Sequence, residues 1–106
     1  MPAAPLAKRF SRLPRATVLD RELPIASTRL TRLLGLAYLD REDAGAGLLI
    51  PRCASVHTFG MRFPLDIYFL DDRGTILDVR RDIPARRVLF CRTAKSVFEA
   101  PARESR

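Results

Sequence analysis

The sequence contains few of the residues that most often carry chemistry. Its 106 residues include one histidine, two cysteines and only two lysines among 19 basic residues. No Ser-x-x-Lys, Gly-x-Ser-x-Gly or paired-carboxylate spacing accompanies the histidine, so no hydrolase motif is visible. The sequence therefore predicts no catalytic residue, no cofactor and no metal ion, and it favours a protein that is not an enzyme.

Long apolar runs are missing too. The run at residues 47–50 stops at Pro51, and no run comes near the roughly 18 to 20 residues that cross a bilayer. Residues 1–10 carry basic side chains without the apolar stretch of about 7 to 15 residues that a secretory signal needs. We therefore expect no membrane span and a cytoplasmic location.

The chain has enough apolar residues for one hydrophobic core. Hydrophobic residues make up 47% of the sequence, and 106 residues is close to the commonest size of a single domain. Residues 1–15 contain three prolines and no periodicity, which is typical of a loose N-terminal arm. We expect one globular domain over residues 16–101, followed by a tail over residues 102–106.

The formal net charge of +7 raises the question of a polyanionic partner. The basic residues are nearly all arginines, scattered in pairs such as Arg80-Arg81 and Arg86-Arg87, whereas a nucleic-acid surface usually clusters them beside aromatic side chains. With abundant alanine, this arginine bias is typical of GC-rich coding. Nucleic acid is not the expected partner, and a weak polyanion binder remains an alternative.

Alternation of apolar residues and turn residues predicts a mostly β fold with short strands. Strands are expected at residues 17–19, 23–26, 48–50, 65–70, 75–80, 88–90 and 96–100. The runs at 65–70 and 75–80 form a β-hairpin around a polar turn that ends in Gly74, a residue suited to the left-handed conformation. The fold class is α+β, with an antiparallel-rich curled sheet or partly closed barrel and one packed amphipathic helix.

That helix follows the first strands. Ser27 or Thr28 can cap it, while Arg29 and Arg32 lie off its apolar stripe and are expected in solvent. Gly35 inside the pattern costs about 1 kcal/mol relative to alanine, which indicates a close approach of another backbone. The stripe that is expected to face the core consists of Leu30, Leu33, Leu34, Ala37 and Tyr38.

Successive blocks of the sequence resemble an uncharacterised bacterial family. The blocks are AST at 26–28, RLLGL at 32–36, GLLI at 47–50, SVHTFGMR at 55–62, PLDIYFLD at 64–71, and Gly74. In this order, over about residues 17 to 101, they resemble domain of unknown function family 192. The resemblance implies strands that curl into a partly closed barrel with the helix packed on it, and it implies no established activity, cofactor or partner.

The sequence departs from that family at two places. Only Phe63 separates Arg62 from Pro64, where many members have a longer stretch, so the loop over any site must differ. Members usually continue past the position of Ala100-Pro101 with a glycine-containing segment, whereas this sequence ends at Arg106. A missing edge strand would leave the sheet open and would allow a homodimer or a partner strand to add to it.

Asp66 is the costliest residue in the expected sheet. It lies between Leu65 and Ile67 in an otherwise apolar run, and an unpaired buried charge costs several kcal/mol. Arg62, four residues earlier, is its nearest candidate partner in sequence, and His57 or a backbone amide are others. The resulting pair either fixes the turn or orients a ligand.

The expected strands gather five polar groups on one rim, which favours a small binding cleft over a hydrolytic site. In the leading hypothesis, the protein is a non-enzymatic binding or accessory module for an anionic or hydroxylated ligand. The ligand meets Arg62 and His57, and Asp66 orients Arg62. A purely structural His57 is one alternative, and a small enzyme with His57 as acid-base or Cys53 as nucleophile is another. The rim consists of His57, Thr58, Arg62, Asp66 and Tyr68.

The two cysteines, Cys53 and Cys91, are expected to be buried free thiols that behave as small hydrophobic residues. A disulfide between them is an alternative that a reducing cytosol disfavours. Zinc ligation by both cysteines and His57 is arithmetically feasible, but no Cys-x-x-Cys pair or second histidine supports it.

Overall fold

The computed structural model describes residues 8–103, which begin with a short 3-10 helix, η1 (Lys8–Phe10). Phe10 is buried in the main core, and Arg9 donates hydrogen bonds to the carbonyls of Gly35 and Ala37 at 2.7 and 2.6 Å. The expectation of a loose arm is therefore wrong from residue 8 onward, because an aromatic anchor and a guanidinium tie this stretch down. Residues 1–7 and 104–106 lie outside the described residues.

The strands form three antiparallel units, with the hairpin at 65–83 as predicted. The largest is a sheet of four strands in the order β3–β8–β5–β6, and the others are the pairs β1–β2 and β4–β7. The bounds are β1 Arg15–Val18, β2 Arg21–Pro24, β3 Leu48–Pro51, β4 Ser55–His57, β5 Leu65–Leu70, β6 Ile76–Ile83, β7 Val88–Phe90 and β8 Ser96–Pro101. Sequence analysis did not predict β4, which is three residues long and, over residues 8–103, pairs only with β7.

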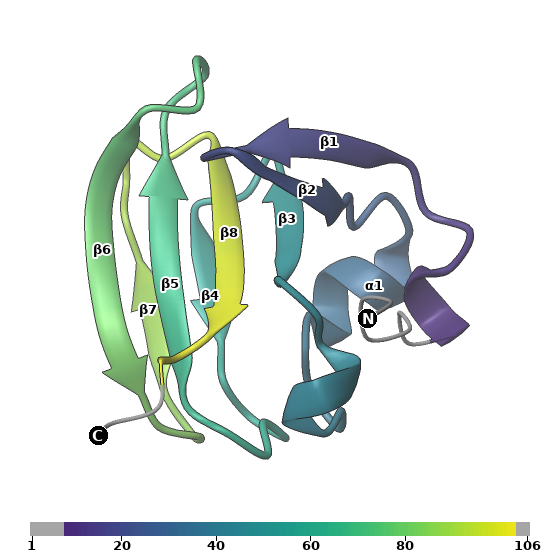
Figure 1. The fold of residues 1–106 in the computed structure, drawn as a ribbon. Helices are drawn as coiled ribbons and strands as arrows, with labels where there is room; N and C mark the ends of the chain where they lie inside the picture. Colours follow the sequence, from purple (N-terminus) through teal and green to yellow (C-terminus); the bar gives the residue numbers. More distant parts are fainter. Residues whose placement is uncertain (1–7, 104–106) are drawn as a thin grey trace.

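The main core fills the space between the four-stranded sheet and the β4–β7 pair. In Figure 1, β4 and β7 lie behind β5 and β8. Side chains from both layers meet there: Ile67 and Phe69 of β5 and Val97 of β8 belong to the same cluster as Val56 of β4 and Leu89 of β7. The short β4–β7 pair is therefore held in place by apolar burial rather than by edge-to-edge hydrogen bonds with the larger sheet.

A smaller core lies on the opposite face of the sheet. Leu70 of β5 and Phe98 of β8 pack there with Leu23 of β2, so the β1–β2 hairpin covers part of this face. Successive side chains of a strand point to opposite faces. On β8, Phe98 consequently faces the hairpin, whereas Val97 and Glu99 face the main core.

The helix α1 (Arg29–Leu34) begins as predicted but is oriented differently. Thr28 caps it, and Thr28 with Thr31 completes a reciprocal capping box. Of the apolar stripe that was expected on the core, Ala37 is buried there, but the expectation is wrong for Leu30 and Leu33, which are 59% and 65% exposed. The residues that are buried in this region are Thr31, Leu36 and Ala37.

Two contacts explain this orientation. Arg32, which was expected in solvent, donates to the carbonyls of Pro51 and Arg52 at the end of β3, so the polar side of the helix is turned toward the sheet. The helix then ends after six residues at Gly35, whose φ of +55° and ψ of −124° redirect the chain. The stripe never completes the two turns over which helical spacing would align it.

The fold is α+β and mostly β, with a curled sheet that does not close into a barrel over the described residues. The last strand, β8, is central in the sheet, between β3 and β5, so the edges of the sheet are β3 and β6. A second 3-10 helix, η2 (Arg41–Asp43), precedes β3. No helix within residues 8–103 is long and apolar enough to cross a membrane.

Candidate functional site

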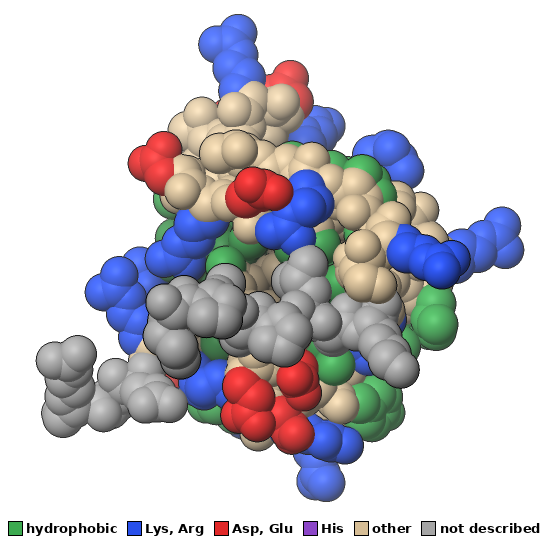
Figure 2. Space-filling model, turned by 45° about the vertical axis from the view of Figure 1, so that its right-hand side comes forward, with side chains coloured by type: hydrophobic (Ala, Val, Ile, Leu, Met, Phe, Trp, Pro, Cys, Tyr) green, Lys and Arg blue, Asp and Glu red, His purple; other side chains and the backbone are tan. Residues whose placement is uncertain are grey.

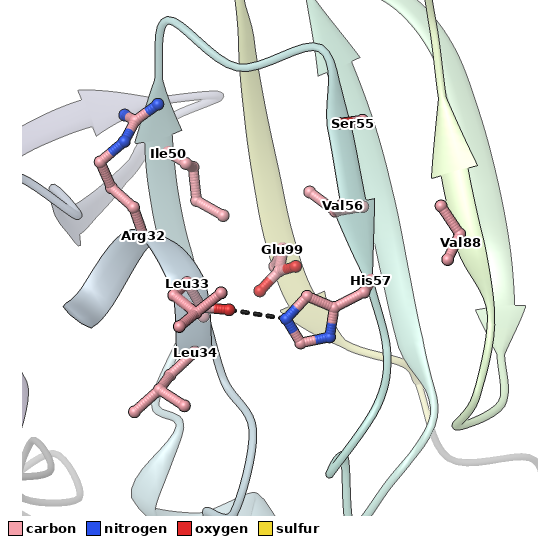
Figure 3. Close-up of a pocket in the computed structure, with 10 residues that line it drawn as sticks. Arg32, Leu33, Leu34, Ile50, Ser55, Val56, His57, Val88 and Glu99 are labelled. Carbon is pink, nitrogen blue, oxygen red and sulfur yellow. Dashed lines mark hydrogen bonds between the residues drawn. The ribbon is translucent and has the colours of Figure 1, made fainter. Parts of the chain in front are cut away.

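A pocket of about 270 Å³ opens between the end of α1 and the strands β4 and β8. Figure 3 shows Glu99 reaching from β8 into the space between α1 and β4, with the His57 ring beside it. The wall is partly apolar and partly polar. The lining residues are Arg32, Leu33, Leu34, Gly35, Ile50, Ser55, Val56, His57, Val88 and Glu99.

Glu99 is the most unusual group of the pocket. Its side chain is 1% exposed, and among the described residues the carboxyl accepts one hydrogen bond, from the Leu36 N–H at 3.3 Å. Burial raises the pKa of this carboxyl to about 7, against the opposing effects of the Leu36 N–H and the Arg9 guanidinium. Near neutral pH the group is present both as a carboxylic acid and as a carboxylate.

Gly35 and Arg9 fix the position of this carboxyl. A Cβ built on Gly35 would overlap Glu99 Oε1 and would lie 3.2 Å from Glu99 Cδ, so glycine is required by a close approach as well as by its φ of +55°. The sequence predicted a close approach here, but the neighbour is a side chain rather than a backbone. Burial lowers the pKa of the Arg9 guanidinium, and the nearby Glu99 opposes that effect.

His57 joins β4 to α1 through one ring nitrogen, and its other ring nitrogen is bonded to the backbone two residues further on. The Phe59 N–H donates to Nδ1 at 3.1 Å, so Nε2 carries the proton and donates to the Leu33 carbonyl at 2.6 Å (Figure 3). With both nitrogens bonded to the backbone, the imidazole has no free nitrogen for an acid-base step. Its role in this arrangement is structural, and its ring forms one wall of the pocket.

The other residues of the predicted rim do not line this pocket. Thr58 is fully buried, donating to the Pro84 carbonyl at 2.7 Å and accepting from the Arg87 N–H at 2.8 Å, so it fixes the loop before β7. Arg62 lies at the surface and pairs with Asp40 at 3.1 Å. The expected Asp66–Arg62 pair is therefore not formed.

Asp66 and Tyr68 lie on the opposite face of the sheet from His57. Asp66 is 5% exposed; it accepts from the Asp82 N–H at 2.9 Å and pairs with Arg81 at 3.4 Å. Tyr68 stacks on Phe98 with ring centroids 5.1 Å apart. A backbone amide was one alternative partner besides Arg62 and His57, and the ionic partner of Asp66 comes instead from the neighbouring strand β6, which pairs with β5.

Both cysteines are free thiols, and both are half-buried rather than buried. The Cys91 N–H donates to the Ala54 carbonyl at 2.9 Å, and the Cys53 thiol donates to the Ser55 carbonyl at 3.0 Å. Burial raises the pKa of the Cys53 thiol. Within residues 8–103, no three His, Cys, Asp or Glu side chains are grouped closely enough to hold a metal ion.

Sequence analysis missed Glu99, although a usable signal was present. Glu99 stands in the apolar run Val97-Phe98-Glu99-Ala100, which is the same pattern that singled out Asp66. Its partner Gly35 was noted for a different reason. The sequence does not indicate that Gly35 and Glu99 are in contact, because they are far apart along the chain: 63 positions separate Glu99 from Leu36, the neighbour of Gly35.

Comparison with known proteins supports the fold. A candidate transcription regulator from Sinorhizobium meliloti 1021 is 21% identical with a TM-score of 0.67, over 83% of this chain and 78% of that one. A protein of unknown function from Novosphingobium aromaticivorans is 18% identical with a TM-score of 0.60, over 83% and 71%. At such identities the likeness concerns the fold alone. No protein of curated function matches the chain.

The sequence model of one family covers nearly the whole chain. It is that of domain of unknown function 192 (DUF192), described as an uncharacterized ACR, and it matches residues 13–105. The matched range contains β1 to β8 and α1, and hence every side chain that lines the pocket. The protein is a member of the DUF192 family, whose function is uncharacterised.

Proposed function

We propose that the protein is a non-enzymatic binding module whose pocket takes a small hydroxylated molecule. The observation that carries the proposal is the Glu99 carboxyl at the floor of the pocket, which has one hydrogen-bond partner among the described residues. A carboxyl group near its pKa both donates and accepts hydrogen bonds, and a hydroxyl group does the same. A buried carboxyl with a single hydrogen-bond partner has capacity left for the hydrogen bonds of a ligand.

An anionic ligand fits this pocket less well. The buried acid repels an anion, and the one guanidinium on the wall, Arg32, is already bonded to the carbonyls of Pro51 and Arg52. Arg62, which was expected to receive an anion, is at the surface with Asp40. Of the two ligand classes that the sequence favoured, the hydroxylated one is therefore retained.

The enzymatic alternatives lose their support. An acid-base role for His57 needs a free ring nitrogen, and both of its nitrogens are engaged by Leu33 and Phe59. A nucleophilic Cys53 needs a lowered pKa, whereas burial raises it. The cytoplasmic location stays a prediction, and it is supported by Cys53 and Cys91, because a reducing compartment keeps thiols free.

Two substitutions at one position test the proposal. Glu99→Leu removes the hydrogen-bonding group, and Glu99→Gln keeps a donor and an acceptor but no charge. We expect an NMR titration of the wild-type protein with 1-butanol to shift the amides of Leu33, Ser55 and His57. Glu99→Leu should weaken this binding at least tenfold, as the loss of a buried hydrogen bond predicts, and Glu99→Gln should change it less than about threefold.

The control variant is Asp66→Asn, on the other face of the sheet, which should bind 1-butanol like the wild type. The wild-type titration stands even if Glu99→Leu does not fold. Shifts that map to Asp66 and Tyr68 instead of the pocket would contradict the proposal, and so would an absence of pocket shifts with any alcohol. Equal loss of 1-butanol binding in both Glu99 variants would also contradict the proposal, because glutamine keeps a hydrogen-bond donor and an acceptor.

A further inference from the structure

Five exposed apolar side chains lie on or next to the elements that form the pocket. We call them the apolar rim, and they are Leu30, Leu33, Phe59, Val88 and Phe90. Leu33 and Val88 line the pocket directly, and they are 65% and 68% exposed. Isolated exposed apolar side chains are common, but a contiguous group marks a binding surface.

The structure places these side chains next to one another. In the β4–β7 pair, Val88 is opposite His57 and Phe90 is opposite Ser55, so Val88 and Phe90 flank two polar residues of the pocket. Because they are two positions apart on β7, they point to the same side. Phe59 follows β4, and its ring centroid lies 6.1 Å from that of His57.

The helix contributes the remaining part of the rim. Leu30 precedes Leu33 by three positions, so the two side chains are neighbours on one side of α1. Their exposure follows from Arg32 and Thr31, which turn the polar side of the helix toward the protein. This apolar side is therefore left without a partner by the fold itself.

The size and the chemistry of the pocket indicate which kind of ligand covers the apolar rim. Ligand pockets usually measure roughly 300 to 1,000 Å³, so a pocket of about 270 Å³ accommodates only part of an ordinary small ligand. Its floor is polar and its mouth is apolar. Leu33 and Val88 line the same pocket as Glu99, so a molecule bound at Glu99 has exposed apolar side chains beside it.

We propose that the ligand is amphipathic, with a hydroxyl head that reaches Glu99 and an aliphatic chain that lies on the apolar rim. This inference rests on the proposed function and narrows its ligand class. The inference excludes free polyols as ligands, because they have no aliphatic chain that could pack on the apolar rim. It also excludes carboxylates of the same chain length, whose head would face a buried acid.

The test is a set of titrations with ethanol, 1-butanol, 1-hexanol and 1-octanol, with glycerol and hexanoate alongside. We expect the affinity to rise up to about fourfold for each added methylene, the value for full burial of that group. Glycerol and hexanoate should bind at least tenfold more weakly than 1-hexanol. The dissociation constants come from amide shifts at concentrations that leave the circular dichroism unchanged.

Variants of the exposed rim identify the surface without disturbing the core. Leu33→Ser and Val88→Ser should each weaken 1-hexanol binding about fivefold or more, and should change ethanol binding less than twofold. The matched control is Leu77→Ser, because Leu77 is an exposed apolar residue on β6 and lies outside the pocket lining. It should bind 1-hexanol like the wild type.

The outcomes separate the two proposals. If the pocket amides shift equally for short and long alcohols, the binding module stands and the amphipathic ligand is wrong. If rim variants do not affect 1-hexanol, the inference is also wrong. If no alcohol shifts the amide signals of the pocket, both the binding module and the amphipathic ligand are wrong. A dimer in sedimentation that is abolished by Leu33→Ser or Val88→Ser would assign the rim to a second copy and overturn the inference.

Discussion

Glu99 should make the stability of the protein depend on pH. The folded state raises the pKa of this carboxyl from its ordinary value of 4.5 to about 7, so between these values the folded protein holds a proton that the unfolded chain has released. The free energy of unfolding therefore falls as pH rises from about 4.5 to about 7 and levels off above that. The difference corresponds to roughly 3 kcal/mol.

Glu99→Gln should remove this pH dependence. We expect the wild type to lose roughly 2 to 3 kcal/mol between pH 5 and pH 8 in urea unfolding, and the variant to lose much less of it. Glu22→Gln is the control, because Glu22 forms an exposed pair with Arg15 at 2.6 Å. The same loss in the Glu99 variant as in the wild type would show that another group titrates.

Gly35 should tolerate no side chain, for two separate reasons. Its backbone lies in a region that residues other than glycine enter at a cost of about 1 to 3 kcal/mol, and a Cβ there would overlap Glu99. Gly74 isolates the first reason, because its φ is +81° and nothing lies within 4 Å of a Cβ built on it. Gly35→Ala should therefore destabilise the protein more than Gly74→Ala.

The comparison of these two glycine variants uses the free energy of unfolding in urea. Gly74→Ala gives the backbone cost alone, about 1 kcal/mol. The excess for Gly35→Ala combines the overlap with the carboxyl and the further backbone cost of its ψ of −124°, and we expect it to exceed about 1 kcal/mol. Equal losses for the two variants would mean that Glu99 moves aside freely and that the floor of the pocket is not fixed.

Among the helices and strands, α1 is the element whose buried side was predicted wrongly from the spacing of its apolar residues. Apolar residues at helical spacing usually mark the buried side of a helix, and here that rule predicted burial of Leu30, Leu33 and Tyr38. All three are exposed, because the helix has six residues and is oriented by the contacts of Arg32 and by its capping box. In so short a helix, a few polar contacts outweigh the apolar stripe.

His57 is the link that holds α1 against β4, so His57→Asn should loosen the helix. An Asn side chain can still accept the Phe59 N–H two residues on, as in an Asx turn, but it is too short to reach the Leu33 carbonyl. We expect a loss of about 1 kcal/mol in stability. The amides of Arg32 and Gly35, which close the helix, should exchange with deuterium severalfold faster.

The control for this link is Ser55→Ala on the same strand, which should leave helix exchange unchanged. Unchanged exchange of Arg32 and Gly35 in His57→Asn would show that the contacts of Arg32 alone hold α1. Both substitutions also change the wall of the pocket, because His57 and Ser55 line it.

At the scale of the whole molecule, the net charge of +7 is spread rather than concentrated. On the face drawn in Figure 2, arginine and lysine side chains are scattered around the outline with acidic side chains between them. Binding of a 20-base-pair DNA duplex should thus be weak at 20 mM salt and lost at 150 mM, as for a diffuse electrostatic attraction. Submicromolar binding at 150 mM in fluorescence anisotropy would restore the polyanion-binder hypothesis.

Dimerisation through an open sheet edge is untested, and the composition of the edge argues against it. The described strand β6 pairs only with β5, and it carries Asp78, Arg80, Arg81 and Asp82. Charged side chains protect natural edge strands from pairing with other copies. We expect a monomer in sedimentation velocity up to about 100 μM, and a concentration-dependent dimer that Leu33→Ser leaves intact would assign the interface to β6.

The sequence by itself determined the strands of the two hairpins, the cap at Thr28 and the buried carboxylate at Asp66. These follow from alternation, turn chemistry and the cost of a charge in an apolar run, all of which act over a few neighbouring residues. The rim that sequence analysis assembled did not form, because His57 and Asp66 lie on opposite sides of the sheet.

Only the tertiary structure decided where the pocket lies and which side of α1 is buried. The pocket depends on the insertion of β8 between β3 and β5, which brings Glu99 beside Gly35 and Leu36 from the far end of the chain. The orientation of α1 depends on the contacts of Arg32 with the carbonyls of Pro51 and Arg52. Local periodicity contains no information about such pairing, since a strand of the same pattern fits any place in the sheet. The physical reason is that burial and desolvation depend on neighbours in space and not on neighbours in sequence.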